Sequence, residues 1–250
     1  MHGYIDLHCH WIPNIDDGAK SVEDGLAMLK GLYSVGFSTV MATPHMKPGM
    51  FENDQAVLRR AFEDMRPHIE GATQIPRVEL ASEHFLDDIV SARLLSGEGL
   101  TYPPIFATTP QRLKPVLIEF PTHAFPTFTQ RKLFELRRAG LSVVIAHPER
   151  YQPVWKDDKC LDPFLDAGAC LLLDVCAVIG KYGRDAQKSA EKLLEEGAYE
   201  AACSDAHRPG DVELVQKAIE RLAELTGKEE AERLLKGGPA SILGAPRLPS

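Results

Sequence analysis

The sequence lacks several features that mark common classes of protein. Its five cysteines are an odd number without a CxxC pair, so we expect neither a disulfide framework nor a dithiol redox motif, and a reducing compartment suits the chain. The sequence contains no apolar run of membrane-spanning length and begins without a secretory signal pattern. We therefore expect a cytoplasmic protein without direct membrane insertion.

Basic residues are also in deficit. The 36 Asp and Glu residues outnumber the 28 Lys and Arg residues, and the formal net charge is −8. Proteins that bind nucleic acids usually carry a basic surface, so we expect no nucleic-acid partner. A small anionic substrate stays compatible with this charge if it meets a local positive site.

Short apolar runs alternate with amphipathic stretches along almost the whole chain. This alternation predicts an α/β protein with a parallel sheet and helical crossovers. Ser21, with Asp24 three residues later, resembles a capping box at the start of a helix. Strands are expected at residues 4–8, 38–42, 77–81, 116–120, 142–146, 170–175 and 199–203, and helices at residues 21–35, 54–69, 129–139, 184–196 and 211–225.

Seven predicted strands in one uninterrupted series favour a closed or nearly closed barrel in a single domain, residues 1–250. An open, doubly wound sheet is the alternative. Residues 97–115 carry four prolines and predict an irregular loop, and residues 237–250 predict an irregular tail.

Side chains that bind metals follow the predicted strands at their carboxyl ends. In the DLHCH string, His8 and His10 point to the same side of an extended chain, where two imidazoles can bind one metal ion. Other predicted strands are followed by, or end in, further histidines and acids, namely His45, Glu83, Glu119, His147, Asp205 and His207.

The recurrence of these residues carries more weight than any one of them. Barrels place their functional residues at the carboxyl ends of the strands. Burying so many carboxylates and imidazoles together is costly unless cations neutralise them. The sequence therefore predicts a multinuclear metal site. For the adjacent acids of DDGAKS (residues 16–21) two interpretations stay open, turn formation or one further ligand.

The strings DLHCH, DDGAKS, ATPH, HPER and SDAH, in this order and spacing, resemble the PHP (polymerase and histidinol phosphatase) superfamily. More closely, they resemble its bacterial branch of manganese-dependent protein-tyrosine phosphatases from capsule and exopolysaccharide operons. The resemblance runs from Ile5 to the final helix. It implies a distorted seven-stranded (β/α) TIM-like barrel with three divalent metal ions, manganese first and iron, zinc or cobalt as alternatives.

The resemblance also implies which residues hold the three ions. Asp17 is preferred over Asp16 because the family's ligand is the acid directly before the glycine, and Glu79 is the fallback for Glu83. The implied sets are His8, His10, Glu83 and Asp205 for one ion; the shared Glu83 with Glu119 and His147 for a second; and Asp17, His45 and His207 for the third.

Two arginines and one histidine are further candidates for the reaction. Arg150 of HPER matches a phosphate-binding arginine of the family directly. Arg208 is the candidate for the second one, although it lies nearer to SDAH than the family pattern places it, and a surface-loop role is the alternative. His123 is a candidate general acid, with a plain loop histidine as its alternative.

The implied activity is hydrolysis of phosphotyrosine by a metal-activated hydroxide, with the tail of a membrane-associated tyrosine kinase as the protein partner. The cysteine-based route needs an arginine six positions after a cysteine, and those positions hold Ile15, Asp166, Cys176, Tyr182 and Pro209. A P-loop signature is absent too. The alternatives are another phosphomonoesterase of the superfamily, such as a histidinol-phosphate phosphatase, and a non-catalytic regulator that binds phosphotyrosine.

Overall fold

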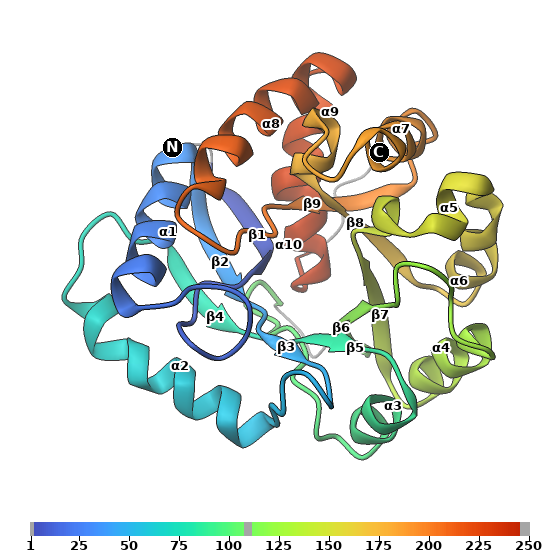
Figure 1. Ribbon diagram of the computed structural model, residues 1–250, viewed down its shortest axis with the longest axis horizontal. Helices are drawn as coiled ribbons and strands as arrows, with labels where there is room; N and C mark the ends of the chain where they lie inside the picture. Colours follow the sequence, from blue (N-terminus) through green and yellow to red (C-terminus); the bar gives the residue numbers. More distant parts are fainter. Residues whose placement is uncertain (1–2, 108–111, 246–250) are drawn as a thin grey trace.

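The computed structural model describes residues 3–107 and 112–245, in which strands and helices alternate (Figure 1). Every pair of neighbouring strands in the two sheets is parallel. The strands are β1 (Tyr4–Cys9), β2 (Phe37–Ala42), β3 (His45–Met46), β4 (Arg77–Leu80), β5 (Glu83–Phe85), β6 (Lys114–Glu119), β7 (Leu141–Ala146), β8 (Cys170–Asp174) and β9 (Tyr199–Cys203).

Helices surround the strands in Figure 1 and cover the outside of the sheets. The α-helices are α1 (Val22–Val35), α2 (Gln55–Glu70), α3 (Asp88–Leu95), α4 (Thr129–Arg138), α5 (Gln152–Lys156), α6 (Asp162–Asp166), α7 (Arg184–Glu195), α8 (Asp211–Thr226), α9 (Lys228–Glu232) and α10 (Gly238–Ile242). Short 3-10 segments lie at η1 (Pro148–Arg150), η2 (Asp158–Leu161) and η3 (Val175–Ile179), and a π-helical turn lies at η4 (Arg233–Gly237). Within the described residues, no helix combines the length and the apolar character that crossing a bilayer requires.

The strands form two sheets, with the orders β1-β2-β4 and β3-β5-β6-β7-β8-β9. All seven predicted strands are present, but the predicted count of seven is wrong, because the described residues contain nine strands. The chain leaves β2 through Thr43 and Pro44 before β3, and it leaves β4 through Ala81 and Ser82 before β5. Proline fixes its own φ and lacks an N–H group, so a ladder breaks readily where Pro44 stands. The predicted strands at residues 38–42 and 77–81 thus lie in the first sheet as β2 and β4, and each is followed by a short strand, β3 or β5, that was not predicted and belongs to the second sheet.

The five predicted helices correspond to α1, α2, α4, α7 and α8 to within one residue at each end. The Ser21 hydroxyl oxygen accepts a hydrogen bond from the Asp24 N–H at 3.2 Å, as the predicted cap requires. Gly36 ends α1 at φ +116°, a conformation that residues with a Cβ rarely adopt. The sequence patterns missed α3 and the shorter helices, whose few turns give little periodicity.

The predicted irregular tail is wrong at its beginning. Helix α10 continues the chain from Gly238 to Ile242, with Pro239 in its first turn, where a proline is tolerated. A Cβ at Gly238 would lie 1.8 Å from the Glu200 carbonyl oxygen, so this helix packs directly against β9. Residues 246–250 of the predicted tail lie outside the described residues.

The described residues of the predicted loop at 97–115 are irregular up to Leu113. Strand β6 then begins at Lys114, inside the predicted loop. Residues 108–111 of this loop lie outside the described part of the chain.

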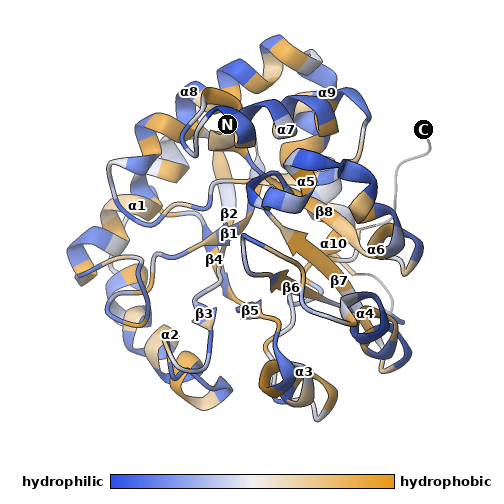
Figure 2. Cartoon of the chain, turned by 45° about the vertical axis from the view of Figure 1, so that its right-hand side comes forward, coloured by the Kyte–Doolittle hydropathy of each residue, from blue (hydrophilic) through white to orange (hydrophobic). Residues whose placement is uncertain are grey.

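Most strands bury both of their faces, whereas β4 is only partly buried. Along β7, Val143 and Ile145 belong to the large apolar cluster under the helices, and Val144 and Ala146 belong to the inner cluster between the strands. This explains why the strands are nearly continuous apolar runs rather than alternating ones. Figure 2 shows this for β7 and β8, which are orange, while the surrounding helices carry both blue and orange residues. The ends of the strands are therefore the places where polar side chains can gather.

Candidate metal centre

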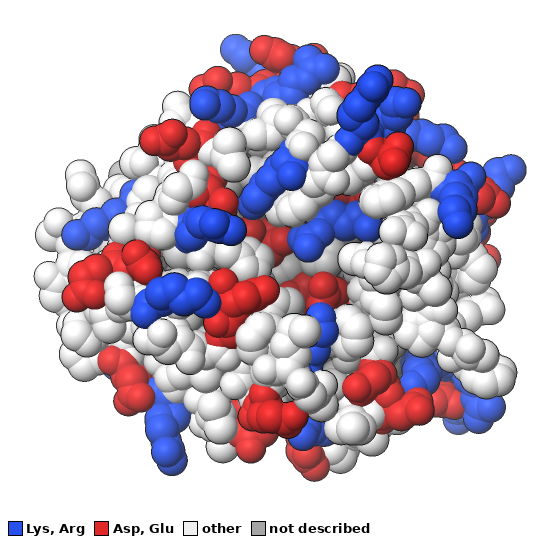
Figure 3. Space-filling model, in the orientation of Figure 1, with Lys and Arg blue, Asp and Glu red and all other residues white. Residues whose placement is uncertain are grey.

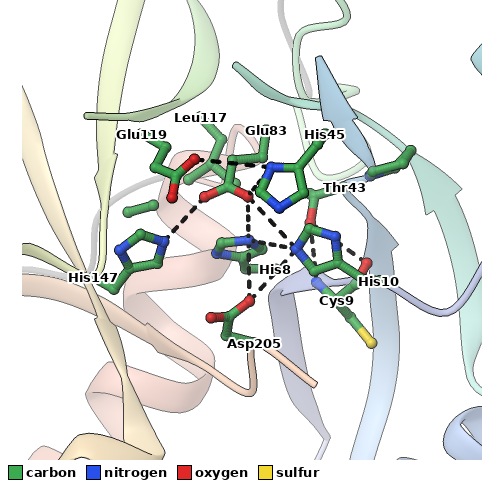
Figure 4. A network of polar contacts seen from close by, with 12 residues as sticks. His8, Cys9, His10, Thr43, His45, Glu83, Leu117, Glu119, His147 and Asp205 are labelled. Atoms are coloured by element: carbon green, nitrogen blue, oxygen red, sulfur yellow. Dashed lines mark hydrogen bonds and ion pairs between the residues drawn. The ribbon is translucent and has the colours of Figure 1, made fainter. Parts of the chain in front are cut away.

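Nine side chains converge at the carboxyl ends of the strands, and they are the nine that the sequence analysis singled out as metal ligands. We call them the ligand cluster. Four overlapping groups of their nitrogen and oxygen atoms each fit within 4.8 Å. The ligand cluster comprises His8, His10, Asp17, His45, Glu83, Glu119, His147, Asp205 and His207. Figure 4 shows His8, His10, His45, Glu83, Glu119, His147 and Asp205 pointing toward one another.

The innermost group joins β1 to the first residue of β5 and to the segment after β9. His8 Nε2 lies 3.2 Å from Glu83 Oε2 and 3.3 Å from Asp205 Oδ1. His10 Nε2 lies 3.6 Å and 3.5 Å from the same two oxygens and 3.0 Å from His8 Nε2. These four residues are the predicted set for the first ion; His8, His10 and Asp205 form one of the four groups, and Glu83 contacts both histidines.

Glu83 connects this group to the next one. Its Oε1 lies 3.0 Å from His147 Nε2, and its Oε2 lies 2.9 Å from His45 Nδ1. The same His45 nitrogen is 3.9 Å from Glu119 Oε2. Glu83, Glu119 and His147 were predicted to share the second ion. In the structure Glu119 forms a group with His45 and Glu83 instead of with His147. Glu83 is thus the common member of two of the four groups, as a bridging carboxylate would be.

Asp17, His45 and His207 also meet, as predicted for the third ion. Asp17 Oδ1 lies 3.4 Å from His45 Nε2 and 3.5 Å from His207 Nε2. The Asp17 side chain is 54% exposed, so this end of the ligand cluster opens to solvent.

The neighbouring Asp16 has a different task. Its Oδ2 accepts hydrogen bonds from His10 Nδ1 at 2.8 Å and from the His45 N–H at 3.0 Å. A carboxylate that holds the second ring nitrogen of a histidine fixes which nitrogen faces the metal. The loop can press this close because residue 18 is glycine, where a Cβ would lie 2.1 Å from the His10 carbonyl oxygen.

His147 and Asp205 both adopt positive φ angles, +38° and +43°, directly after the strand ends. Residues with a Cβ rarely adopt this conformation and hold it only where surrounding contacts impose it. Here the His147 N–H donates to the Leu172 carbonyl oxygen at 2.8 Å, and the Asp205 N–H donates to the His8 carbonyl oxygen at 2.9 Å. Each backbone thus turns its side chain into the ligand cluster while its N–H group stays bound to the neighbouring strand.

Burial governs the electrostatics of the site. Burial and then the Glu83 charge raise the pKa of Glu119 to about 7. Burial alone would raise the pKa of Glu83 as well, but His8 and His45 beside it hold this pKa well below its ordinary value. Burial and then the Arg150 charge lower the pKa of His147 to about 4, so its ring is neutral and able to bind a metal.

These residues fit divalent cations. Glu119 Oε2 is buried and accepts no hydrogen bond from the described residues, which is costly for a carboxylate oxygen without a cation. Imidazole nitrogens and carboxylate oxygens together suit Mn, Fe, Zn and Co ions. Figure 3 shows a hollow near the middle of the viewed face, with acidic side chains inside it and basic side chains at its margin.

The other candidates from the sequence fall in different places. Arg150 Nη1 lies 2.7 Å from Asp205 Oδ2, at the edge of the ligand cluster. The Arg208 N–H donates to Asp211 Oδ2 at 3.2 Å, which places its backbone beside the site but gives its guanidinium no role. His123 is exposed in the loop after β6. The roles of Arg208 and His123 stay predictions. Glu79, the fallback for Glu83, pairs instead with Arg77 at 2.6 Å.

Sequence reasoning missed several residues that position the ligands. Asp6 Oδ1 accepts hydrogen bonds from the His8 N–H at 3.3 Å and the Ser204 N–H at 2.9 Å, and so ties β1 to the segment after β9. Asp211 Oδ2 accepts from the His207 N–H at 2.9 Å. The available signal for Asp6 is an acid two positions before HxH in an apolar strand, where burial demands partners.

Comparisons with known proteins agree with this picture. A family model described as capsular polysaccharide synthesis, CpsB/CapC, matches residues 4–244. The chain is 27% identical over 209 residues to the tyrosine-protein phosphatase YwqE of Bacillus subtilis, covering 81% of this chain and 77% of YwqE. It is 28% identical over 255 residues to the tyrosine-protein phosphatase CpsB of Streptococcus pneumoniae, covering 96% of this chain and 98% of CpsB.

A solved structure confirms the fold. It comes from the pair YwqE of Bacillus subtilis and CpsB of Streptococcus pneumoniae, and it covers 98% of this chain and 97% of its own at 24% identity, with a TM-score of 0.83. The family predicted from the sequence motifs is thereby confirmed. This chain belongs to the CpsB/CapC family of capsular polysaccharide synthesis.

Proposed function

We propose that this protein is a metal-dependent tyrosine-protein phosphatase that hydrolyses phosphotyrosine with its ligand cluster. The observation that carries the proposal is the convergence of nine imidazole and carboxylate side chains at one end of the strands. The names of the relatives support the substrate, since YwqE and CpsB are both named tyrosine-protein phosphatases. The pair that includes the solved structure is described as metal-dependent.

The ligand cluster would hold three divalent cations, with manganese as the expected metal. The four overlapping groups and the shared Glu83 support more than one ion. When bound, such cations neutralise the phosphate charge and lower the pKa of a water molecule, which supplies a nucleophile at neutral pH. The protein's own contribution is to place nitrogen and oxygen donors. Asp16 holds the His10 ring, and Asp6 holds the backbone of His8.

Arg150 would bind the substrate phosphate. Its guanidinium lies 2.7 Å from Asp205 Oδ2 and 3.9 Å from Asp174 Oδ2, and it lies 4.4 Å from the centre of the Tyr182 ring. These contacts hold a planar group with several N–H donors beside the ligand cluster. Phosphoryl transfer passes through a loose transition state in which charge gathers on the phosphate oxygens, and a fixed guanidinium stabilises that charge.

The cysteines support a metal route rather than a thiolate route. Burial raises the pKa of both Cys9 and Cys203 well above the ordinary value. A thiol nucleophile needs a lowered pKa and access to substrate. Both side chains are buried, and they face apolar clusters rather than the hollow.

We also propose that the two sheets act as one distorted barrel. Support comes from the backbone links across the breaks, where the Ala81 N–H donates to the Ala42 carbonyl oxygen at 2.8 Å and the Glu83 N–H donates to the Pro44 carbonyl oxygen at 3.2 Å. A parallel bridge between Cys9 and Ala206 links β1 to the segment after β9. This arrangement brings all the strand ends around one opening.

The expected partner is a phosphotyrosine protein, namely the tail of a membrane-associated tyrosine kinase, and the expected compartment is the cytoplasm. Support for the partner comes from the family description, which names capsular polysaccharide synthesis.

The test is a side-by-side assay with added manganese on a phosphotyrosine peptide and on histidinol phosphate. We expect hydrolysis of the peptide that chelation abolishes and manganese restores, and little turnover of histidinol phosphate. Preference for histidinol phosphate would instead make the protein that other phosphomonoesterase. Binding of the peptide without turnover would make it a regulator. Activity that survives chelation but is lost on thiol alkylation would overturn the metal mechanism.

A further inference from the structure

The segment after β3 forms a tight turn at the edge of the ligand cluster. The Phe51 N–H donates to the Lys47 carbonyl oxygen at 2.8 Å, and the Lys47 N–H donates back to the Phe51 carbonyl oxygen at 3.4 Å. The buried Asn53 amide donates to the His45 carbonyl oxygen at 2.8 Å and to the Ile15 carbonyl oxygen at 3.0 Å. The turn is thus anchored to a residue of the ligand cluster.

Aromatic packing fixes the same turn from its inner side. The Phe51 ring stacks on the His45 imidazole, with ring centres 5.3 Å apart and an angle of 7° between their planes. Lys47, at the start of the turn, is therefore held at a defined distance from His45 rather than on a free loop.

The Lys47 side chain bends toward the ligand cluster instead of extending into water. Its Nζ lies 4.1 Å from the centre of the Phe85 ring and 3.8 Å from Glu119 Oε2, and the side chain is 23% exposed. Lysines are mostly exposed in folded proteins, so this inward position requires a reason. The distance to Glu119 is too long for a hydrogen bond, so the ammonium keeps its three N–H donors.

Arg150 differs in this respect. Its guanidinium already donates to Asp205 at 2.7 Å, whereas the structure gives the Lys47 ammonium no hydrogen bond within the described residues. Figure 4 shows Glu119 and Asp205, the acids contacted by Lys47 and Arg150, at different ends of the labelled network, with Glu83 and His8 between them. Lys47 and Arg150 therefore contact different acids of the ligand cluster.

We propose that Lys47 binds the phosphate group of the substrate, from the Glu119 side of the ligand cluster. This inference rests on the proposed function and adds a residue to it. When Glu119 binds a cation, its charge is no longer available to Lys47, and a dianionic phosphate becomes the partner for the ammonium. The Phe85 ring beneath the ammonium would hold the side chain in place without using any of its donors.

The test measures binding of inorganic phosphate to the manganese-loaded protein by calorimetry, so it does not depend on turnover. We expect Lys47→Met, which keeps the stem and removes the charge, to weaken phosphate binding about tenfold. Its manganese content should equal that of the wild type, and the KM for a phosphotyrosine peptide should rise by a similar factor. Lys47→Arg should bind phosphate within about threefold of the wild type.

Lys132→Met is the matched control. Lys132 is also partly buried and pairs with an acid, Asp88, but it joins α4 to α3 away from the ligand cluster. This variant should bind phosphate like the wild type. If Lys47→Met does not fold, Lys47→Gln provides the same measurement.

Unchanged phosphate affinity in the folded Lys47→Met or Lys47→Gln variant would overturn the inference. Loss of manganese from that variant would also overturn it, because Lys47 would then be part of the metal site. A wild-type protein that binds no phosphate would overturn it as well. If the wild type binds phosphate through Lys47 but does not hydrolyse the peptide, the proposed function fails and the assignment of Lys47 stands.

Discussion

Glu119 in the ligand cluster and Glu149 outside it are both buried acids, and they differ in how their oxygens are used. Glu149 is buried like Glu119, and burial followed by the Asp174 charge raises its pKa to about 8. Yet Glu149 Oε1 accepts from the Asp174 N–H at 3.0 Å and Oε2 accepts from the Tyr199 hydroxyl at 2.9 Å. Glu119 Oε2 accepts no hydrogen bond among the described residues. Burial and a raised pKa are thus common to Glu119 and Glu149, and what distinguishes Glu119 is its place among the other donor atoms of the ligand cluster.

The strongest test of this comparison replaces one buried acid inside the ligand cluster and one outside it. Asp205→Ala removes a predicted ligand, so we expect loss of bound manganese and a fall of at least about 100-fold in kcat/KM. His147→Ala should behave alike. Asp174→Asn is the matched control, because Asp174 is as deeply buried as Asp205 but belongs to none of the four groups. Metal content measured by mass spectrometry should fall in the first two variants alone, and equal manganese in all three would remove the distinction.

A smaller effect is expected from the residue that holds His10. Asp16→Asn keeps the shape of the side chain but removes the charge that fixes the His10 ring. The affinity for manganese should fall about 10- to 100-fold, since residues behind the ligands typically contribute that much. Titration of manganese into the metal-free protein gives this value. Asp24→Asn, an acid at the start of α1, should leave it unchanged.

The smallest effect concerns the pH dependence of stability that Glu149 contributes. The folded pKa of about 8 lies above the ordinary value of 4.5, so between these pH values the folded state keeps a proton that the unfolded state has lost. The free energy of unfolding therefore falls as pH rises through this window, by at most about 1.4 kcal/mol per unit. Glu149→Gln has no such proton and should show a shallower slope in urea unfolding of the metal-free protein. An unchanged slope would mean that Glu149 does not carry this dependence.

The sequence predicts the ligand cluster better than it predicts the frame around it. HxH and the residues after apolar strands were predictable because a strand presents alternate residues to one side and ends at a common edge. The break between β4 and β5 was not, because the three residues of β5 are defined by pairing with β3 and β6. The turn at Lys47 was missed for a similar reason, since its inward direction depends on Phe85 and Asn53 from other parts of the chain.

The proposed ligands extend along the chain from His8 to His207, and this has a consequence for how the protein is made. The first histidines leave the ribosome early, but Asp205 and His207 are translated only after about four-fifths of the 250 residues. A nascent or truncated chain therefore carries a partial set of donors and cannot complete the innermost group. Binding of all the metal ions would therefore require that translation has passed His207. An interrupted translation product would stay without its full complement of ions.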